Sequence, residues 1–176
     1  ASMRYCIRIS LLLLLFSFSA GGLAAPATKA LAGIPNFHTV APGIYRGGAP
    51  TREGLKALSK MGVRTIIDLR IEKQAKRVEK PLAEKMGFTW IHIPMGREAP
   101  TEKQVATFLA TLAKAPERPV FVHCQHGADR TGCMIGIYRV QVQKWPFERA
   151  WAEMLRYGFK PWLHELKAAV RSRARS

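Results

Sequence analysis

The sequence predicts an α/β fold in which a mostly parallel central sheet is flanked by helices. Short apolar and β-branched segments, such as residues 63–69 and 120–122, have the composition of buried strands. Segments with apolar residues at helical spacing alternate with these strands along the chain. Because strands that alternate with helices are joined by crossover connections, their sheet is expected to be mostly parallel.

Each predicted element has a local signal. A charged segment with Val78 and Leu82 four positions apart is typical of a surface helix. Thr51 is an N-cap residue type directly before a helix, and Thr101 with Gln104 has the spacing of a capping box. The predicted strands span residues 44–46, 63–69, 88–93 and 120–122. The predicted helices span residues 51–61, 72–86, 101–115, 130–143, 146–157 and 161–173.

The start of the chain has the pattern of a secretory signal peptide, predicted for residues 1–25. Arg4 and Arg8 precede an apolar stretch at 9–18, and small residues suited to cleavage follow at 22–25. The apolar stretch is shorter than the roughly 20 residues that a spanning helix needs, which favours a cleaved leader. The sequence therefore predicts an exported, periplasmic protein, and an uncleaved signal that anchors the protein to a membrane is the alternative.

The remainder of the chain is predicted to form one domain. Residues 1–2 precede Met3, the expected initiator, and are not expected to belong to the natural leader. Residues 26–42 are rich in Ala, Pro and Gly and lack periodicity, so they are predicted to be a flexible lead-in. The domain proper is predicted to span residues 43–176, a length typical of a single compact domain.

Composition and charge narrow the classes of function. The 176 residues are 48% apolar, which excludes a disordered protein. The formal net charge is +16, so an anionic partner is expected: a phosphorylated substrate, an anionic membrane surface or nucleic acid.

Besides Cys6 in the leader, the chain has only Cys124 and Cys133. Two thiols do not make a disulfide framework, so we interpret one as reactive and one as packed, with a regulatory disulfide between them as the alternative.

The strongest signal for chemistry is the segment 123–132, which reads His-Cys-Gln-His-Gly-Ala-Asp-Arg-Thr-Gly. It lies between a buried strand and the N-terminus of a helix, where backbone N–H groups and the helix dipole favour an anion. The sequence therefore predicts a phosphate-binding loop. Its predicted phosphate-binding residues are Gln125, His126, Gly127, Ala128, Asp129 and Arg130.

Within this loop the residue types indicate nucleophilic catalysis. Donors that favour phosphate also favour a thiolate, so the pKa of Cys124 is expected to be lowered and the thiolate to attack phosphorus. The planar guanidinium of Arg130 can bind two phosphate oxygens and stay with them as charge develops. Thr131 can donate its hydroxyl to the sulfur when the phosphoenzyme is hydrolysed. The flanking His123 is expected to support the loop through a backbone hydrogen bond.

These residues resemble the signature of the protein tyrosine phosphatase superfamily, His-Cys-x5-Arg-Ser/Thr. The sequence is most similar to the small bacterial dual-specificity-like phosphatases, some of them periplasmic, over about residues 43–162. Further similar segments are 45–50, 63–70, 93–95 and 145–159. The resemblance implies a parallel-rich sheet with helices on both sides, a phosphocysteine intermediate, and a tyrosine or dual-specificity protein phosphatase that needs no cofactor.

The sequence departs from the family in its general acid. Family members usually supply an Asp from the loop after the strand equivalent to 88–93, but residues 94–101 contain none. Three carboxylates are candidates, in the order Asp129, Glu98 and Asp68. Asp129 lies in the phosphate loop, an arrangement similar to the myotubularin-type lipid phosphatases. Glu98 lies in the loop where the acid is expected, and Asp68 ends a strand whose carboxyl edge borders the same crevice.

Other functions are kept as alternatives. The substrate could be a phosphoinositide or an inositol phosphate instead of a phosphoprotein, and the missing Asp leaves an inactive phosphate-binding module open. A nucleic-acid or membrane-surface binder ranks below the enzyme, because charge is far less specific than the loop; nucleic acid is not expected, and an anionic membrane surface stays open as a partner. No metal is expected, since His123, Cys124 and His126 lack the paired ligand spacing of zinc sites.

Overall fold

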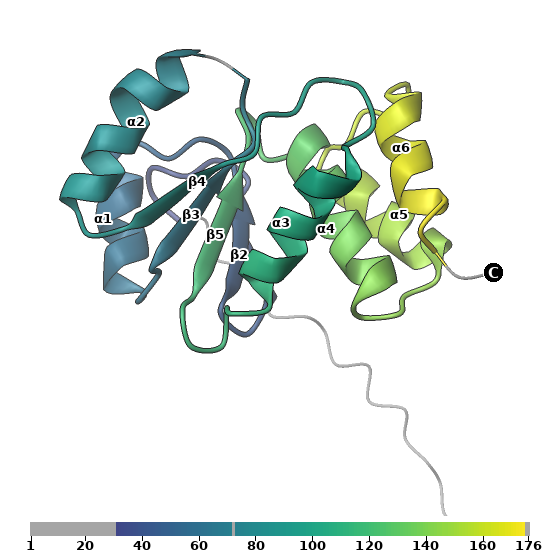
Figure 1. The fold of residues 1–176 in the computed structure, drawn as a ribbon, viewed down its shortest axis with the longest axis horizontal. Coiled ribbons are helices and arrows are strands. Elements are labelled where there is room, and N and C mark those ends of the chain that lie inside the picture. The colour runs from purple at the N-terminus through teal and green to yellow at the C-terminus, as the bar shows by residue number, and fades with distance from the viewer. Residues whose placement is uncertain (1–30, 72, 175–176) are drawn as a thin grey trace, which may run out of the picture.

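A computed structural model describes residues 31–71 and 73–174 (Figure 1). The signal peptide predicted at residues 1–25 lies outside the described residues, and so does the first part of the lead-in, residues 26–30. The strands are β1 (His38–Ala41), β2 (Ile44–Gly47), β3 (Thr65–Asp68), β4 (Thr89–His92) and β5 (Val120–His123). The helices are α1 (Arg52–Lys60), α2 (Lys73–Lys85), α3 (Glu102–Leu112), α4 (Asp129–Gln141), α5 (Phe147–Arg156) and α6 (His164–Arg171).

The five strands form one sheet in the order β1-β2-β5-β3-β4. The pairs β2–β5, β5–β3 and β3–β4 are parallel, and only β1 runs antiparallel to its neighbour β2. Helices α1 and α2 lie on one side of the sheet and α3 to α6 on the other (Figure 1). The predicted class, a mostly parallel sheet flanked by helices, is confirmed. Parallel strands place their carboxyl ends at one edge, where an α/β sheet binds its ligands.

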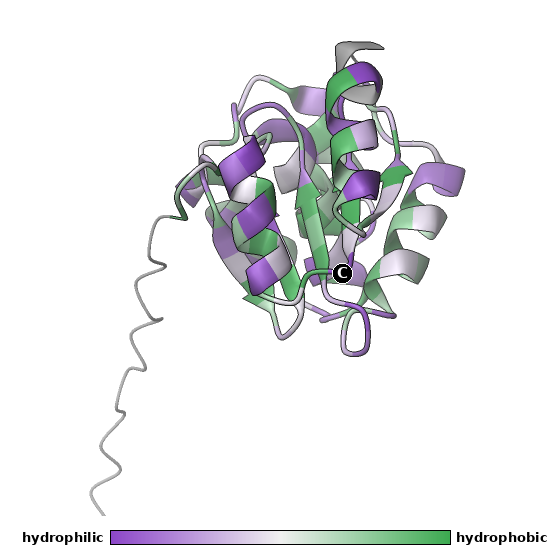
Figure 2. Ribbon diagram, turned by 90° about the vertical axis from the view of Figure 1, so that its left-hand side faces the viewer, coloured by the Kyte–Doolittle hydropathy of each residue, from purple (hydrophilic) through white to green (hydrophobic). Residues whose placement is uncertain are grey.

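The central strands bury both of their faces, which explains why their sequences are continuous apolar runs. Ile66 and Phe121 pack in the hydrophobic core on the side of α1 and α2. Ile67 and Val122 pack in the larger core on the side of α3 to α6. In Figure 2 the strands are hydrophobic and the outer faces of the helices carry hydrophilic residues. The two cores fix the carboxyl edge of the sheet from both sides.

The helix starts predicted at Thr51 and Thr101 are confirmed, whereas the last helix begins at His164 and not at residue 161. The Thr51 hydroxyl accepts a hydrogen bond from the Gly54 backbone N–H at 3.2 Å. At α3 the capping box is complete: the Thr101 hydroxyl accepts from the Gln104 N–H at 3.2 Å, and the Gln104 side chain accepts from the Thr101 N–H at 2.8 Å. Among the described residues, the helices are all too short or too polar to cross a bilayer.

The domain begins earlier than the sequence predicted. The lead-in was expected to continue to residue 42, but β1 within it pairs with β2. Three apolar side chains of the same segment, Ile34, Phe37 and Val40, are buried in the two cores. These side chains lie three positions apart, which is not the alternation of a strand, while the surrounding Ala, Pro and Gly suggested a linker. The boundary at residue 43 is therefore wrong, and residues 31–42 belong to the domain.

Candidate active site

The predicted phosphate loop connects the buried strand β5 to the N-terminus of the buried helix α4, as expected. Gly127 in the loop has φ +71°, a left-handed conformation that favours glycine. A Cβ atom at this position would collide with the backbone of Gly47, at the end of β2. The loop therefore packs directly against the neighbouring strand, and a glycine is required at the contact.

Three carbonyl groups of the loop are held by donors on its outer side. The Cys124 carbonyl lies 3.2 Å from the His123 Nδ1 atom, and the Gln125 carbonyl accepts from the Ala49 N–H at 3.1 Å. The Gly127 carbonyl accepts from the Arg46 Nη2 atom at 2.8 Å and from the Asn36 Nδ2 atom at 3.1 Å.

These hydrogen bonds also orient the N–H groups of the loop. In a trans peptide the N–H points opposite to the C=O of the same peptide unit. The N–H groups of Gln125, His126 and Ala128 are therefore turned away from the donors that hold the carbonyls. The result is a set of backbone donors on the inner side of the loop, which is the arrangement that binds a phosphate dianion.

Cys124 lies at the foot of the loop and is 2% exposed. Burial favours the neutral thiol, but hydrogen bonds from the Thr131 side chain and N–H, the charge of Arg130 and the Gly127 N–H outweigh it. Together they hold the pKa of the Cys124 thiol below its ordinary value. A nucleophilic thiolate at neutral pH, predicted from the loop sequence, is consistent with this environment.

The two residues predicted to assist Cys124 lie at the start of α4. The Thr131 hydroxyl is fully buried, and its Oγ1 atom has no nitrogen or oxygen partner in the described part of the chain. It is thus available to the Cys124 sulfur. The Arg130 Nη1 atom lies 3.5 Å from the Met95 carbonyl, just after β4.

The second thiol, Cys133, has a different environment. It is fully buried on α4, its Sγ atom donates to the Leu166 carbonyl at 3.4 Å, and burial raises its pKa to about 12. A thiol with this pKa is a poor nucleophile at neutral pH. Both Cys124 and Cys133 are free cysteines, and Cys133 has the properties of the packing residue that the sequence predicted.

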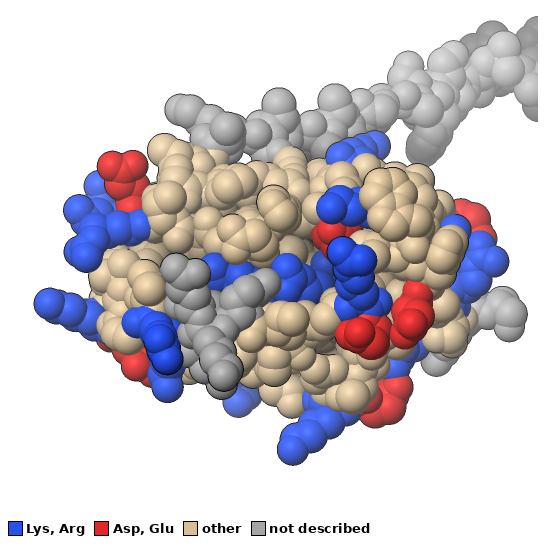
Figure 3. Space-filling view, turned by 90° about the horizontal axis from the view of Figure 1, so that it is seen from above, with Lys and Arg blue, Asp and Glu red and all other residues tan. Residues whose placement is uncertain are grey.

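A cavity of about 300 Å³ opens above the loop, and we call it the mouth. It contains the predicted residues His126, Asp129 and Arg130, and the sequence did not single out its other cations, Arg97 and Lys160. In the view from above (Figure 3), Lys and Arg side chains cross the middle of this face of the molecule. The mouth is lined by Ile71, Gly96, Arg97, His126, Asp129, Arg130, Lys160, Trp162, Leu163 and Leu166.

The three candidate acids lie in different places. Asp129 lines the mouth beside Arg130, and its Oδ1 atom accepts from the Lys160 N–H at 2.9 Å. Glu98 is exposed, and its carboxylate lies against Gly96 in a separate hollow of about 210 Å³. Asp68 is fully buried behind the loop. Burial opposes its ionisation, but hydrogen bonds from Arg70 and the charge of His123 hold the pKa of Asp68 below its usual value. An ionised, inaccessible carboxylate cannot protonate a leaving group, so Asp68 is excluded.

Arg46 and Asn36 both hold the phosphate loop through the Gly127 carbonyl, and sequence reasoning missed them. Arg46 is 1% exposed, its guanidinium packs 4.7 Å from the centre of the Tyr157 ring, and burial lowers its pKa to about 10. It therefore remains charged at neutral pH. One signal was present: Arg46 is a charged residue in the middle of a buried strand, which proteins tolerate only where the charge has a partner or a function. Asn36 gave no such signal.

Comparison with known proteins places the chain in a family. Residues 31–170 match the family described as a DSP-PTPase phosphatase fused to NAD⁺ kinase. The dual specificity protein phosphatase TpbA of Pseudomonas aeruginosa strain UCBPP-PA14 is 28% identical over 165 residues, which cover 87% of this chain and 73% of TpbA. The inositol diphosphatase DSP5 of Arabidopsis thaliana is 34% identical over 115 residues, which cover 63% of this chain and 56% of DSP5.

The solved structures agree with this assignment at the level of the fold. A TpbA variant from P. aeruginosa, crystallised in complex with phosphotyrosine, superposes with a TM-score of 0.67 at 23% identity, covering 81% of this chain and 87% of that one. The fold, the loop and the environment of Cys124 define a cysteine-dependent phosphatase. The chain belongs to the DSP-PTPase phosphatase family, and it spans 73% of TpbA but little more than half of DSP5.

Proposed function

We propose that this phosphatase acts on phosphorylated proteins, with phosphotyrosine among its substrates. The observation that carries the proposal is a pair of apolar side chains at the mouth: Trp162 is 67% exposed and Ile71 is 59% exposed. Apolar side chains that are exposed together around a hollow often mark a site that meets a ligand or partner. Beside Arg130 they offer apolar walls to the ring of an aryl phosphate. The similarity to a dual specificity protein phosphatase over most of the chain supports this choice.

The reaction proceeds in two steps. The Cys124 thiolate attacks phosphorus and forms an S–P bond, while the P–O bond to the substrate breaks and Asp129 donates a proton to the leaving oxygen. Arg130 and the backbone N–H groups of the loop bind the equatorial oxygens. Water then gives a proton to the Asp129 carboxylate and attacks the phosphocysteine, which breaks the S–P bond and releases inorganic phosphate. The Thr131 hydroxyl donates to the departing Cys124 thiolate.

Asp129 is the acid in this proposal because it lines the mouth beside Arg130, whereas Glu98 lines a separate hollow. The hydrogen bond from the Lys160 N–H occupies the Oδ1 atom of Asp129 and leaves Oδ2 for the proton. No residue of the 94–101 loop is needed for proton transfer, which accounts for the missing Asp in that loop.

A second candidate substrate is an inositol phosphate that carries a diphosphate group. Arg97 and Lys160 line the mouth together with Arg130, so more than one phosphate group would find a cation there. The similarity to an inositol diphosphatase supports this candidate. The apolar walls favour the phosphoprotein and the extra cations favour the polyphosphate, so the two candidates make opposite predictions for substitutions at the mouth.

The test is a comparison of kcat/KM for a phosphotyrosine peptide, a phosphoserine peptide and an inositol diphosphate, with wild type, Cys124→Ser and Trp162→Ala. We expect turnover of the phosphotyrosine peptide, its complete loss in Cys124→Ser, and a KM for this peptide that rises about tenfold in Trp162→Ala. Turnover of the inositol diphosphate alone would contradict the protein substrate. No turnover of any substrate under reducing conditions would instead indicate a phosphate-binding module.

We also propose that the protein is exported to the periplasm, from the leader pattern of residues 1–25. Fractionation of cells that express the full chain with a C-terminal tag tests this. We expect a shortened product, cleaved near residue 24 or 25, in the periplasmic fraction. An uncut product in the membrane fraction would support the anchored alternative, and a cytoplasmic product would contradict export.

A further inference from the structure

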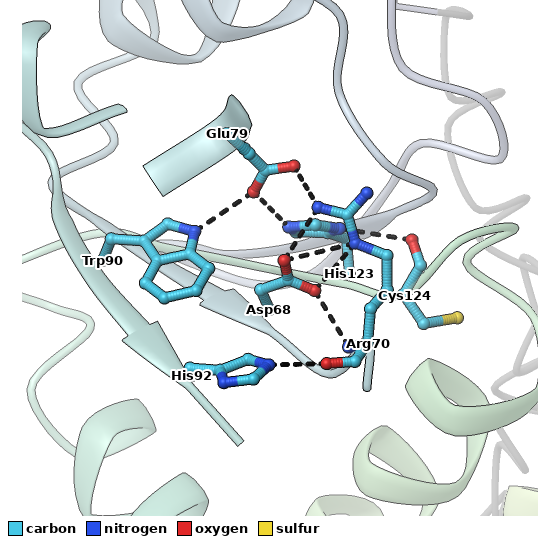
Figure 4. Close-up of polar contacts among 7 residues, drawn as sticks. All are labelled: Asp68, Arg70, Glu79, Trp90, His92, His123 and Cys124. Atoms are coloured by element: carbon cyan, nitrogen blue, oxygen red, sulfur yellow. Dashed lines mark hydrogen bonds and ion pairs between the residues drawn. The ribbon is translucent and has the colours of Figure 1, made fainter. Parts of the chain in front are cut away.

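Behind the phosphate loop lies a buried cluster of four charged side chains: Asp68, Arg70, Glu79 and His123 (Figure 4). The Arg70 Nη2 atom donates to Asp68 Oδ2 at 2.8 Å and to Glu79 Oε2 at 2.6 Å. The side chains of Asp68 and His123 are fully buried, and those of Glu79 and Arg70 are 7% and 11% exposed. Such a cluster is tolerated in a protein interior only where charges are paired and hydrogen-bonded.

The two ring nitrogens of His123 both face acceptors. Nδ1 lies 3.2 Å from the Cys124 carbonyl oxygen, and Nε2 lies 2.9 Å from Glu79 Oε1. Glu79 also accepts from Arg70 at Oε2 and, at 3.2 Å, from the Trp90 indole at Oε1, so both of its oxygens act as acceptors. A carbonyl never donates. A neutral imidazole has one N–H only, so the ring satisfies both partners only as a doubly protonated imidazolium.

The charge count of the cluster leads to the same conclusion. Asp68 and Glu79 are two anions, and Arg70 supplies one cation, so a charged His123 makes the buried cluster neutral. Burial and the positive charge of Arg70 both oppose a charged ring. The hydrogen bond to Glu79 and the negative charges of Glu79 and Asp68 favour it and outweigh them. The pKa of His123 is therefore raised above its usual value.

Asp68, Glu79 and His123 are also residue types that ligate metals, and their ligand atoms lie within 4.8 Å of one another. The guanidinium of Arg70, however, already contacts both carboxylates and occupies the position of a neutralising cation. We therefore interpret the cluster as a network of ion pairs.

We propose that Glu79 is a positioning residue for the nucleophile: it fixes His123 as an imidazolium, which holds the Cys124 carbonyl and places a buried positive charge behind the thiolate. The hydrogen bond to the carbonyl turns the Gln125 N–H toward the inner side of the loop. The charge favours the thiolate over the thiol. This inference rests on the proposed role of Cys124 as nucleophile. Glu79 comes from α2, 45 residues before Cys124, and is not among the residues that line the mouth.

The first test measures the alkylation of Cys124 by iodoacetamide as a function of pH, in wild type and Glu79→Gln. Glutamine keeps an oxygen for the His123 N–H but removes the charge. We expect the midpoint of the alkylation profile to rise by about one pH unit, so that alkylation at acidic pH slows about tenfold and recovers at high pH. Glu84→Gln, on the same helix in an exposed ion pair with Lys80, is the control and should leave the profile unchanged.

Further variants separate the outcomes. A Cys124→Ser sample gives the background from the other thiols. His123→Asn should shift the midpoint as Glu79→Gln does, and the double variant should shift it no further, because both act through one group. An unchanged midpoint in Glu79→Gln would overturn the inference, even if the variant were less stable. A wild type whose Cys124 reacts only at alkaline pH would instead overturn the thiolate nucleophile, and thereby the proposed function.

A second measurement needs no variant and so does not depend on folding of Glu79→Gln. Nitrogen-15 NMR of the histidine rings in the wild-type protein reports the protonation of each nitrogen directly. We expect His123 to show protons on both Nδ1 and Nε2 throughout the neutral pH range. A neutral tautomer of His123 at pH 7 would overturn the inference.

Discussion

The back and the mouth of the phosphate loop are built in opposite ways. At the back, carbonyl groups of the loop are held by Arg46, Asn36, Ala49 and His123. At the mouth, side chains such as Arg97 and Trp162 are exposed. The difference teaches that the position of the nucleophile is fixed by the core, whereas the choice of substrate is left to surface side chains. Substitutions at the back should therefore change kcat, and those at the mouth should change KM or leaving-group dependence.

The largest effect is expected from Asp129→Asn, which removes the proposed acid but keeps an oxygen for the Lys160 N–H. We expect kcat for a phosphoserine peptide to fall about 10²- to 10³-fold, because an alkoxide needs a proton to leave. The kcat for p-nitrophenyl phosphate should fall only a few-fold, because its leaving group needs little help. The kcat values for both substrates should be measured as a function of pH. For the peptide, the fall in kcat at high pH that wild type shows should be absent in Asp129→Asn.

Glu98→Gln is the matched control for this variant, since Glu98 lies in the neighbouring hollow. It should keep most of the activity on both substrates. If kcat for the peptide fell further in Glu98→Gln than in Asp129→Asn, the general acid would be Glu98, in the 94–101 loop. Equal losses on both leaving groups would mean that Asp129 positions Arg130 and transfers no proton.

Arg46→Met tests the back of the loop. Methionine fills much of the volume but releases the Gly127 carbonyl from its 2.8 Å hydrogen bond. We expect kcat for p-nitrophenyl phosphate to fall about 10²-fold, the size of losing one well-placed backbone donor, and inhibition by inorganic phosphate to weaken. The free energy of unfolding should change little, because the variant also removes a buried charge with two unpaired nitrogens.

The control for Arg46→Met is Arg118→Met, at the opposite end of the sheet, where Arg118 donates to the Thr89 hydroxyl. This variant should keep wild-type kinetics. If Arg46→Met also kept wild-type kcat and phosphate inhibition, the back of the loop would not set the geometry of the N–H groups.

A smaller effect is expected when the cations of the mouth are removed. In the double variant Arg97→Ala, Lys160→Ala, we expect the KM for an inositol diphosphate to rise about tenfold, equivalent to ~1.4 kcal/mol. The KM for p-nitrophenyl phosphate, which carries one phosphate group, should change much less. Lys114→Ala, in a different hollow, is the control. Equal KM changes for both substrates would contradict a role in binding a second phosphate.

The smallest effect concerns stability and pH. The folded-state pKa of His123 is raised, so its contribution to stability is fully present below its ordinary pKa of 6.5 and is lost as the pH rises through the folded-state pKa. A pKa that is higher by one in the folded than in the unfolded protein contributes about 1.4 kcal/mol. Asp68, whose pKa is lowered, adds a loss only at acidic pH.

Urea unfolding of wild type and His123→Asn from pH 5.5 to 9 measures this contribution. The difference in free energy of unfolding between the two proteins should shrink as the pH rises. A constant difference would show that His123 contributes by packing, for example by its stacking on Phe121 with ring centres 5.5 Å apart, and not by its charge.

Local signals in the sequence were enough to predict much of this molecule. The helix starts at Thr51 and Thr101 follow from bonds to residues three positions away, and the loop follows from a strand, a cysteine, a glycine and an Arg-Thr pair in one short segment. The export of the protein and the phosphate-contacting role of each loop residue stay predictions. The start of the domain was wrong, because the pairing of β1 with β2 was hidden in a segment without periodicity.

What the sequence by itself determined was therefore the chemistry: a cysteine nucleophile, an arginine and a hydroxyl in a phosphate loop, carried by an α/β sheet. The tertiary structure alone decided which distant residues hold that loop. Arg46 is 81 residues from Gly127, Asn36 is 91 residues from it, and Glu79 is 44 residues from His123. It also removed Asp68 from the candidate acids, because only the fold shows that Arg70 and His123 keep it ionised and buried. Such contacts depend on β2 and β3 flanking β5 in the sheet and on α2 covering one side of that sheet, which no local spacing encodes.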